Sequence, residues 1–141
     1  MNLQFKPAEE TDIPVIYAQA KSLIDTYEDI TSIDYEKVMA WVNRKISSNI
    51  SAYCCVTADD EKCAYFRLHE DGELDDLYVL PAFQGYGVGS EILRKCIVDA
   101  PKPLYLYVFS NNVRAISLYE RFGFTVRETL GKTRCIMERK G

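Results

Sequence analysis

AFQGYGVGSE, residues 82–91, joins an apolar run to a helical pattern and contains glycine at positions 85, 87 and 89. Glycine loses much conformational freedom on folding, so three glycines at alternate positions must provide something that offsets this cost. The first N–H groups of a helix have no partner inside the helix, and the helix dipole adds positive charge there. Without Cβ atoms, an anion such as pyrophosphate can reach those N–H groups. We therefore expect an anion-binding loop that opens a helix at about Gly87.

Other interpretations of this loop differ in how well they fit. A Walker A loop requires a lysine that this sequence lacks after Gly89. A dinucleotide fingerprint requires a third glycine where Ser90 stands, and it normally opens a run of parallel β-α-β units. A glycine-rich turn without any ligand stays open on the glycines alone. If an anion does bind, the Ser90 hydroxyl can add a donor.

Hydrophobic periodicity along the chain predicts the order β-α-α-β-β-β-α-β-α-β-β. Antiparallel strands come first and β-α-β units follow, so we expect an α/β fold (an α+β mixed sheet) with helices on both faces and a single domain over residues 1–141. Capping residues are expected at Thr11 or Asp12, Asn112 and Gly123. The expected strands cover 3–6, 50–58, 62–69, 73–80, 104–109, 124–128 and 133–139, and the helices cover 11–27, 34–46, 88–100 and 112–122.

Composition narrows the class of protein. The 141 residues suit one domain, and a net charge of -4 argues against nucleic acid as the main partner. Five cysteines without a C-x-x-C pair, and a lone His69, predict reduced thiols and no metal site. The N-terminus lacks a signal-peptide core, and no apolar run is long enough to cross a bilayer. We expect a cytoplasmic protein, and the exposed-looking Trp41 is compatible with a homodimer.

The stretch from Gln84 to Gly89 resembles the Q/R-x-x-G-x-G/A loop of the GNAT superfamily of acetyl-CoA-dependent N-acetyltransferases. The preceding DLYVLPAF is similar to the strand and proline that lead into that loop, and NNVRAISLYERFGF is similar to the family's N-x-x-A-x-x-L-Y-x-x-x-G-F segment. The resemblance covers essentially the whole chain, although the first 50 residues match in pattern alone. The positions of the second segment are filled in register by Asn112, Ala115, Leu118, Tyr119, Gly123 and Phe124.

The resemblance implies that acetyl-CoA, a co-substrate, lies where the strands 73–79 and 104–108 splay apart. Its pantetheine arm would pair with the backbone like an added strand, and its pyrophosphate would bind loop N–H groups. Asn112 would contact the cofactor or hold the 108–113 loop; a plain helix cap is the alternative, and the two roles are compatible. The implied backbone contacts are Leu77, Tyr78 and Val79 for pantetheine, and Gln84, Gly85, Tyr86, Gly87, Val88, Gly89 and Ser90 for pyrophosphate.

For catalysis, the resemblance implies that Tyr119 protonates the leaving thiolate, although Tyr119 also shares a helix face with apolar residues. Glu73 has the spacing of the glutamate base in the histone-modifying branch. By strand alternation Asp75 shares its face, while Asp76 points the other way. A mechanism without any single base stays open. His69 is expected at a hairpin end with a surface role.

The acceptor implied by the resemblance is a primary amine of a small molecule or peptide. Carboxylates are dense from residue 70 to 76, so the acceptor mouth would attract a cationic amine, unless these groups are simply solvated in a turn. No cysteine–histidine pair is evident, which favours direct attack in a ternary complex over an acyl-enzyme. A non-catalytic acyl-CoA-binding module and a nucleotide-binding protein are the alternative functions. The carboxylates are Glu70, Asp71, Glu73, Asp75 and Asp76.

Overall fold

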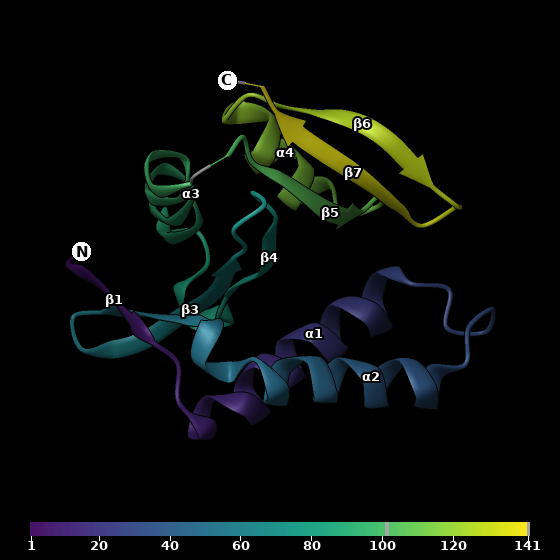
Figure 1. Cartoon of the computed structure of the whole chain (residues 1–141), viewed down its shortest axis with the longest axis horizontal. Coiled ribbons are helices and arrows are strands. Elements are labelled where there is room, and N and C mark those ends of the chain that lie inside the picture. The colour runs from purple at the N-terminus through teal and green to yellow at the C-terminus, as the bar shows by residue number, and fades with distance from the viewer. Residues whose placement is uncertain (101, 141) are drawn as a thin grey trace. The chain divides into compact units, whose positions relative to one another are not determined.

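The computed structural model describes residues 1–100 and 102–140 (Figure 1). Its strands and helices follow the predicted order, which is thereby confirmed. Within the described residues, no helix combines the length and the apolar character that crossing a membrane requires. The elements are β1 (Leu3–Pro7), α1 (Ile13–Tyr27), α2 (Tyr35–Ser48), β2 (Cys54–Ala58), β3 (Glu61–Leu68), β4 (Leu74–Val79), α3 (Val88–Asp99), β5 (Tyr105–Phe109), α4 (Val113–Arg121), β6 (Phe124–Leu130) and β7 (Arg134–Arg139).

The chain forms two compact units, and the first comprises Met1–Arg67 with Asp76–Gln84. Its sheet has the order β1-β2-β3-β4, with β1 and β3 both antiparallel to β2. The apolar faces of α1 and α2 line one core with side chains of the sheet, because each helix repeats apolar residues at the helical period. The buried members of this core are Ala8, Ile16, Ala20, Met39, Val42, Ile46, Tyr53, Cys55, Tyr65 and Tyr78.

Asp12 is a buried charge in this first unit, at 1% exposure. It was expected as a cap of α1, yet its carboxylate accepts the backbone N–H of Glu9 at 2.8 Å. The same carboxylate accepts Lys62 Nζ at 2.8 Å and the Tyr65 hydroxyl at 2.7 Å. Burial alone would raise the pKa of Asp12, but these donors outweigh burial and lower it. Asp12 therefore ties the start of α1 to β3.

The second unit comprises Leu68–Asp75 and the described residues from Gly85 onward. Its antiparallel sheet has the order β5-β7-β6. Helix α4 begins at its Asn112 cap, and Gly123 follows the helix with a φ of 88°, as predicted for a glycine C-cap. The α3 stripe is buried at Val88, Ile92, Leu93 and Cys96.

The sheet differs from the sequence expectation in one respect. The strands belong to two sheets, with β4 at the end of one and β5 at the end of the other. A parallel bridge joins Glu73 to Tyr105, just where the two strands begin. Shortly after it, Asp76 has a φ of 51°, in the left-handed region. This conformation departs from the extended geometry of a strand, and it falls inside β4.

Candidate active site

The glycine-rich loop opens α3 as predicted. Gly85 and Gly87 have φ angles of 85° and 82°, which side chains rarely adopt, and Gly87 is the N-cap of the helix. The first cap hydrogen bond runs from the Glu91 N–H to the Gly87 carbonyl, at 3.1 Å. The N–H groups of the three residues between, 88–90, therefore have no partner inside the helix. A Cβ added at Gly85 or Gly87 would meet no heavy atom within 4 Å, so the loop is open to an incoming group.

Before the loop, β4 is the edge strand of its sheet. An edge strand carries a row of backbone groups that an extended ligand can pair with, and Leu77 to Val79 lie on this strand. The Gln84 side chain donates from Nε2 to the Val79 carbonyl at 3.0 Å. The Gln84 backbone N–H donates to the Pro81 carbonyl at 3.3 Å. Gln84 thus fixes the path from β4 into the loop.

Asn112 caps α4. Its Oδ1 accepts the backbone N–H of Ala115 at 3.2 Å, which satisfies one of the unpaired donors of the helix start. The capping role left open by the sequence is therefore present. A cofactor contact of Asn112 stays a prediction.

Tyr119 lies in the interior of the second unit, at 9% exposure. Its ring packs against that of Phe124, with centroids 5.7 Å apart. Burial raises the pKa of Tyr119 to about 12, because a phenolate is poorly solvated there. At neutral pH the side chain is a neutral O–H donor. The core position and the proton-donor role are both compatible with this environment.

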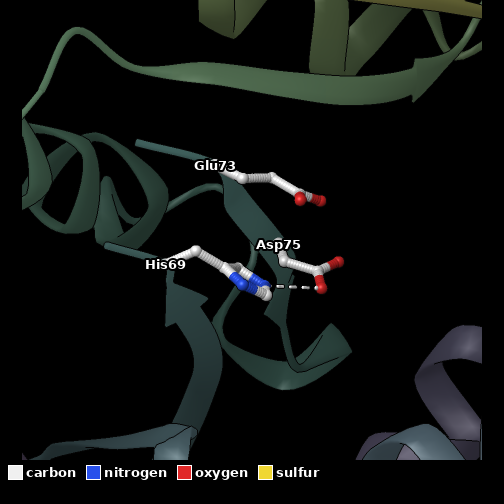
Figure 2. Close-up of side chains that lie close together, drawn as sticks. All are labelled: His69, Glu73 and Asp75. Carbon is white, nitrogen blue, oxygen red and sulfur yellow. Dashed lines mark hydrogen bonds and ion pairs between the residues drawn. The ribbon is translucent and has the colours of Figure 1, made fainter. Parts of the chain in front are cut away.

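Three ionisable side chains meet at the turn between β3 and β4. His69, Glu73 and Asp75 each offer a polar atom, and these atoms all lie within 4.8 Å of one another. The His69 Nε2 is 3.1 Å from Asp75 Oδ2. Figure 2 shows the Glu73 and Asp75 side chains pointing the same way, with the His69 ring reaching the Asp75 carboxylate. The shared face of Glu73 and Asp75 is confirmed.

His69 differs from its expected surface role, since its side chain is only 26% exposed and is paired. The spacing of the cysteines and His69 in the sequence also predicted no metal site. His69, Glu73 and Asp75 nevertheless provide one nitrogen and two carboxylates that a divalent cation could contact. The signal that could have found the cluster is the short turn: it returns the chain so that a residue at the end of β3 faces the start of β4.

The turn is held in place by Asp71 and Tyr105. The Tyr105 hydroxyl donates to Asp71 Oδ2 at 2.6 Å, and the Glu73 backbone N–H donates to Asp71 Oδ1 at 2.9 Å. The Tyr105 hydroxyl, followed by the Glu73 N–H, lowers the pKa of Asp71. The Asp71 carboxylate in turn raises the pKa of Tyr105. These bonds place the Glu73 backbone relative to β5.

The acidic stretch therefore does not act as one cluster. Asp76, in the first unit, accepts the hydroxyls of Tyr53 at 2.5 Å and Tyr78 at 2.7 Å, and its Oδ2 lies 3.1 Å from Lys45 Nζ. A left-handed conformation at a non-glycine residue costs about 1 kcal/mol, and these three partners compensate for it. Asp76 is therefore paired inside its own unit, whereas the sequence predicted only that it points away from Glu73 and Asp75.

The five cysteines are free, and four of them are buried. Burial raises the pKa of the thiols of Cys55, Cys63 and Cys135. A raised pKa keeps a thiol protonated and therefore weakly nucleophilic. Cys96 is buried on α3. These environments disfavour a cysteine acyl-enzyme.

A comparison with known sequences identifies a matching protein family. The sequence model of the Acetyltransferase (GNAT) family matches residues 9–124. The spermine/spermidine N(1)-acetyltransferase of Bacillus subtilis strain 168 is 39% identical over 56 residues, 36% of this chain and 37% of that protein. The mycothiol acetyltransferase of Streptomyces griseus is 35% identical over 69 residues, 44% of this chain and 22% of that protein. The matched stretches therefore span about a third or less of these curated relatives.

Solved structures share the fold at low sequence identity. The apo form of YjaB from Escherichia coli has a TM-score of 0.75 at 20% identity, covering 100% of this chain and 99% of that one. The PaiA N-acetyltransferase of Thermoplasma acidophilum, solved with coenzyme A, has a TM-score of 0.71 at 19% identity and covers 100% of both chains. The family model includes the glycine loop, the β3–β4 turn and Tyr119. The chain belongs to the acetyltransferase (GNAT) family.

Proposed function

We propose that the protein transfers the acetyl group of acetyl-CoA to a primary amine, with residues 1–141 acting as one catalytic domain. The observation that carries the proposal is the open loop at the start of α3, found in a chain of the GNAT family. The family match runs through both compact units, which supports the single domain. The coenzyme A bound to the PaiA relative supports the choice of cofactor.

In this proposal the cofactor is bound mainly by backbone groups. The pyrophosphate binds N–H groups of residues 84–90, where the exposed glycines leave room for it. Because the Gln84 N–H already donates to Pro81, we place most of the binding on the N–H groups from Gly85 to Ser90. The pantetheine arm adds to the edge of β4 at residues 77–79, and Asn112 contacts the cofactor from the start of α4.

The reaction is a direct attack of the amine on the acetyl carbonyl. Glu73 removes a proton from the ammonium group, because only the neutral amine has a free electron pair. The C–N bond forms and its nitrogen loses a second proton to water, while the C–S bond breaks and Tyr119 supplies a proton to the departing sulfur. Water then reprotonates Tyr119 and takes the first proton from Glu73, which restores both side chains. Tyr119 can do so at neutral pH because its raised pKa keeps the phenol protonated. The buried, protonated cysteines support this route over an acyl-enzyme.

The acceptor in this proposal is a cationic amine. The Glu73 and Asp75 carboxylates lie together, and Glu70 beside them is exposed, so the turn favours a positive charge. The partial match to a relative named for spermine and spermidine points the same way. Polyamines, or a lysine or N-terminal amine of a peptide, have the required charge.

Two measurements test this function. A thermal-shift series compares acetyl-CoA, NAD and ATP, and acetyl-CoA alone should raise the melting temperature; saturation at 100 times Kd adds about 2.7 kcal/mol to the free energy of unfolding. An acceptor screen then follows thiol release with spermidine, spermine, a lysine peptide and glutamate.

The outcomes separate the alternatives. Turnover with cationic acceptors supports the proposal, whereas turnover with glutamate alone contradicts the cationic acceptor. Binding of acetyl-CoA without turnover of any amine would identify a non-catalytic acyl-CoA-binding module. Stabilisation by NAD or ATP without an effect of acetyl-CoA would identify a nucleotide-binding protein.

A further inference from the structure

The turn between β3 and β4 brings three possible metal ligands together. The His69 N–H donates to the Glu73 carbonyl at 2.8 Å, so these two residues lie opposite each other across the turn. Asp75 stands two positions after Glu73, and its side chain points the same way (Figure 2). One ring nitrogen and one oxygen of each carboxylate lie within 4.8 Å of one another. Within residues 1–100 and 102–140, no other group of three His, Cys, Asp or Glu side chains meets in this way.

The backbone of this cluster is held by bonds that do not use its ligand atoms. The Glu73 N–H donates to Asp71 Oδ1 at 2.9 Å, and the other oxygen of Asp71 accepts the Tyr105 hydroxyl at 2.6 Å. The side chains of His69 and Asp75 are 26% and 14% exposed, so both are partly shielded from water. All three ligands belong to the second unit. The site is therefore largely formed before an ion arrives, which lowers the cost of binding.

The spacing of the ligand atoms suits a small divalent cation. Zn²⁺ binds imidazole nitrogen and carboxylate oxygen at about 2.0–2.2 Å, which puts neighbouring ligand atoms about 2.9–3.4 Å apart. The His69 Nε2 lies 3.1 Å from Asp75 Oδ2, so this pair already has the required separation. A bound ion takes the place of the hydrogen between these atoms, and the hydrogen of the neutral ring then lies on Nδ1. Glu73 has the longest carboxylate side chain of the set and needs only a small rotation to complete it.

The ligand types distinguish between cations. Mg²⁺ and Ca²⁺ bind mostly through oxygen, whereas an imidazole nitrogen suits Zn²⁺ and its transition-metal neighbours. The two carboxylates supply the negative charge that a divalent cation needs. Three protein ligands leave a further position open for water, as in zinc sites that are not purely structural. His69, Glu73 and Asp75 therefore fit Zn²⁺ better than they fit Mg²⁺ or Ca²⁺.

We propose that His69, Glu73 and Asp75 form a Zn²⁺ site whose occupation inhibits acetyl transfer. The binding is independent of any activity, while the inhibition rests on the proposed acetyltransferase function, in which Glu73 takes a proton from the acceptor amine. A bound ion engages the Glu73 electron pair that would accept this proton. It also replaces negative charge at the turn with positive charge, which repels a cationic acceptor. The glycine-rich loop contributes no ligand to the ion, so the binding of acetyl-CoA should persist.

Binding is tested on the full chain without a histidine tag, by calorimetric titration with ZnCl₂ after removal of metal. Wild type should bind one equivalent of Zn²⁺, and H69Q, E73Q and D75N should each weaken this binding by at least about 10-fold. E70Q removes an exposed charge from the same turn but no ligand, and should keep the wild-type affinity. C54S removes the cysteine that is only partly buried, and should keep it too. Thermal unfolding without metal confirms that each variant is folded.

Inhibition is tested with an acceptor found active with the wild type. Saturating Zn²⁺ should lower kcat on the order of 100-fold, because the contribution of the base is lost, and EDTA should restore it. Acetylated product is measured directly, since the thiol of released CoA also binds Zn²⁺. H69Q should lose far less activity, when each protein with Zn²⁺ is compared with the same protein in EDTA. The thermal shift caused by acetyl-CoA should be the same with and without Zn²⁺.

Contrary results separate the parts of the proposal. The site is wrong if the wild type binds no Zn²⁺, if H69Q and D75N bind it as tightly as the wild type, or if C54S alone abolishes binding. Zn²⁺ that binds the three residues but leaves kcat unchanged, or raises it, refutes the inhibition and keeps the site. If the wild type binds Zn²⁺ but acetylates no amine in EDTA, the proposed function fails and the site stands. Equal inhibition of the wild type and H69Q would show that Zn²⁺ acts elsewhere.

Discussion

The Tyr105 hydroxyl donates a 2.6 Å hydrogen bond to the carboxylate of Asp71, whose other oxygen accepts the Glu73 N–H. One carboxylate thus joins a β5 side chain to the backbone of the proposed base. The bridge between Glu73 and Tyr105 reinforces the same connection. The position of the Glu73 side chain therefore depends on a residue 32 positions later in the sequence, and this dependence can be measured.

Replacing Tyr105 with phenylalanine should lower stability at neutral pH and lower kcat with a cationic acceptor. The pKa of Asp71 is lowered in the folded protein, so its contribution to stability is present above its usual value of 3.8 and is lost as pH falls below it. Urea unfolding of wild type and Y105F should therefore differ more at pH 7 than at pH 3. Y107F, on the same strand, is the control. An equal difference at both pH values would contradict the role of Asp71.

Replacing Tyr119 with phenylalanine should lower kcat by about 100-fold, while the affinity for acetyl-CoA changes little, because the lost group acts on the leaving thiolate. Since the pKa of Tyr119 is raised to about 12, the phenol stays protonated through neutral pH and should produce no alkaline limb below pH ~10. Steady-state kinetics and thermal shift measure both effects. Wild-type turnover in Y119F would remove Tyr119 from the mechanism.

Alanine substitutions in the glycine-rich loop should distinguish the cost of backbone strain from the obstruction of a bound ligand. Gly89 lies within α3, so G89A should keep stability or raise it slightly, yet weaken acetyl-CoA binding on the order of tenfold by blocking the N–H groups. G87A should weaken binding and also cost about 1–2 kcal/mol, because its φ is 82°. Calorimetry and urea unfolding measure these quantities.

Gly131 provides the matched control for this loop. It also has a positive φ, of 57°, and a Cβ there would meet no heavy atom within 4 Å. G131A should therefore lose a similar amount of stability and keep full affinity for acetyl-CoA. If G131A weakened binding as much as G87A, or if G89A bound acetyl-CoA normally, the phosphate site at this loop would be refuted.

Asp12 should be a major contributor to the stability of the first unit. D12N removes the charge that Lys62 and Tyr65 bind, and should cost about 2–3 kcal/mol. Because the pKa of Asp12 is lowered in the folded protein, this stabilisation is present at pH values above 3.8, the ordinary pKa of the carboxyl. It disappears as the pH falls below that value. Urea unfolding from pH 7 to pH 3 should show the gap closing. The exposed pair of Lys21 and Asp25 gives a control, and D25N should have little effect.

Gly72 should tolerate no side chain. Its φ is 97°, and an added Cβ would lie 2.4 Å from the Pro103 carbonyl oxygen, a backbone atom that cannot turn aside. The Gly72 carbonyl also accepts the Tyr105 N–H at 3.1 Å. G72A should therefore cost about 2–4 kcal/mol, from strain and from overpacking. Urea unfolding of G72A and G131A tests this prediction, because G131A introduces the backbone strain without a close contact. Equal losses in the free energy of unfolding would contradict the close approach of Gly72 to Pro103.

Local signals in the sequence were enough to predict the order of the strands and helices, the glycine-rich loop and the cap of α4. Helical and strand periods, the Asn112 cap and the glycine at position 123 act within a few residues, so each is visible in a short window. The alternation that separates Glu73 and Asp75 from Asp76 is equally local. The motif that contains Asn112 and Tyr119 is also local, and it was enough to predict the family.

The tertiary structure alone decided which partners these residues have. Lys62 reaches Asp12 across 50 positions, and Tyr105 reaches Asp71 across 34. It also divided the strands between two sheets and converted His69 from an expected surface residue into the partner of Asp75. Hydrogen bonds and ion pairs act between atoms a few ångströms apart, whatever their separation along the chain. Sequence therefore determined where the glycine-rich loop begins, and folding determined which side chains contact one another.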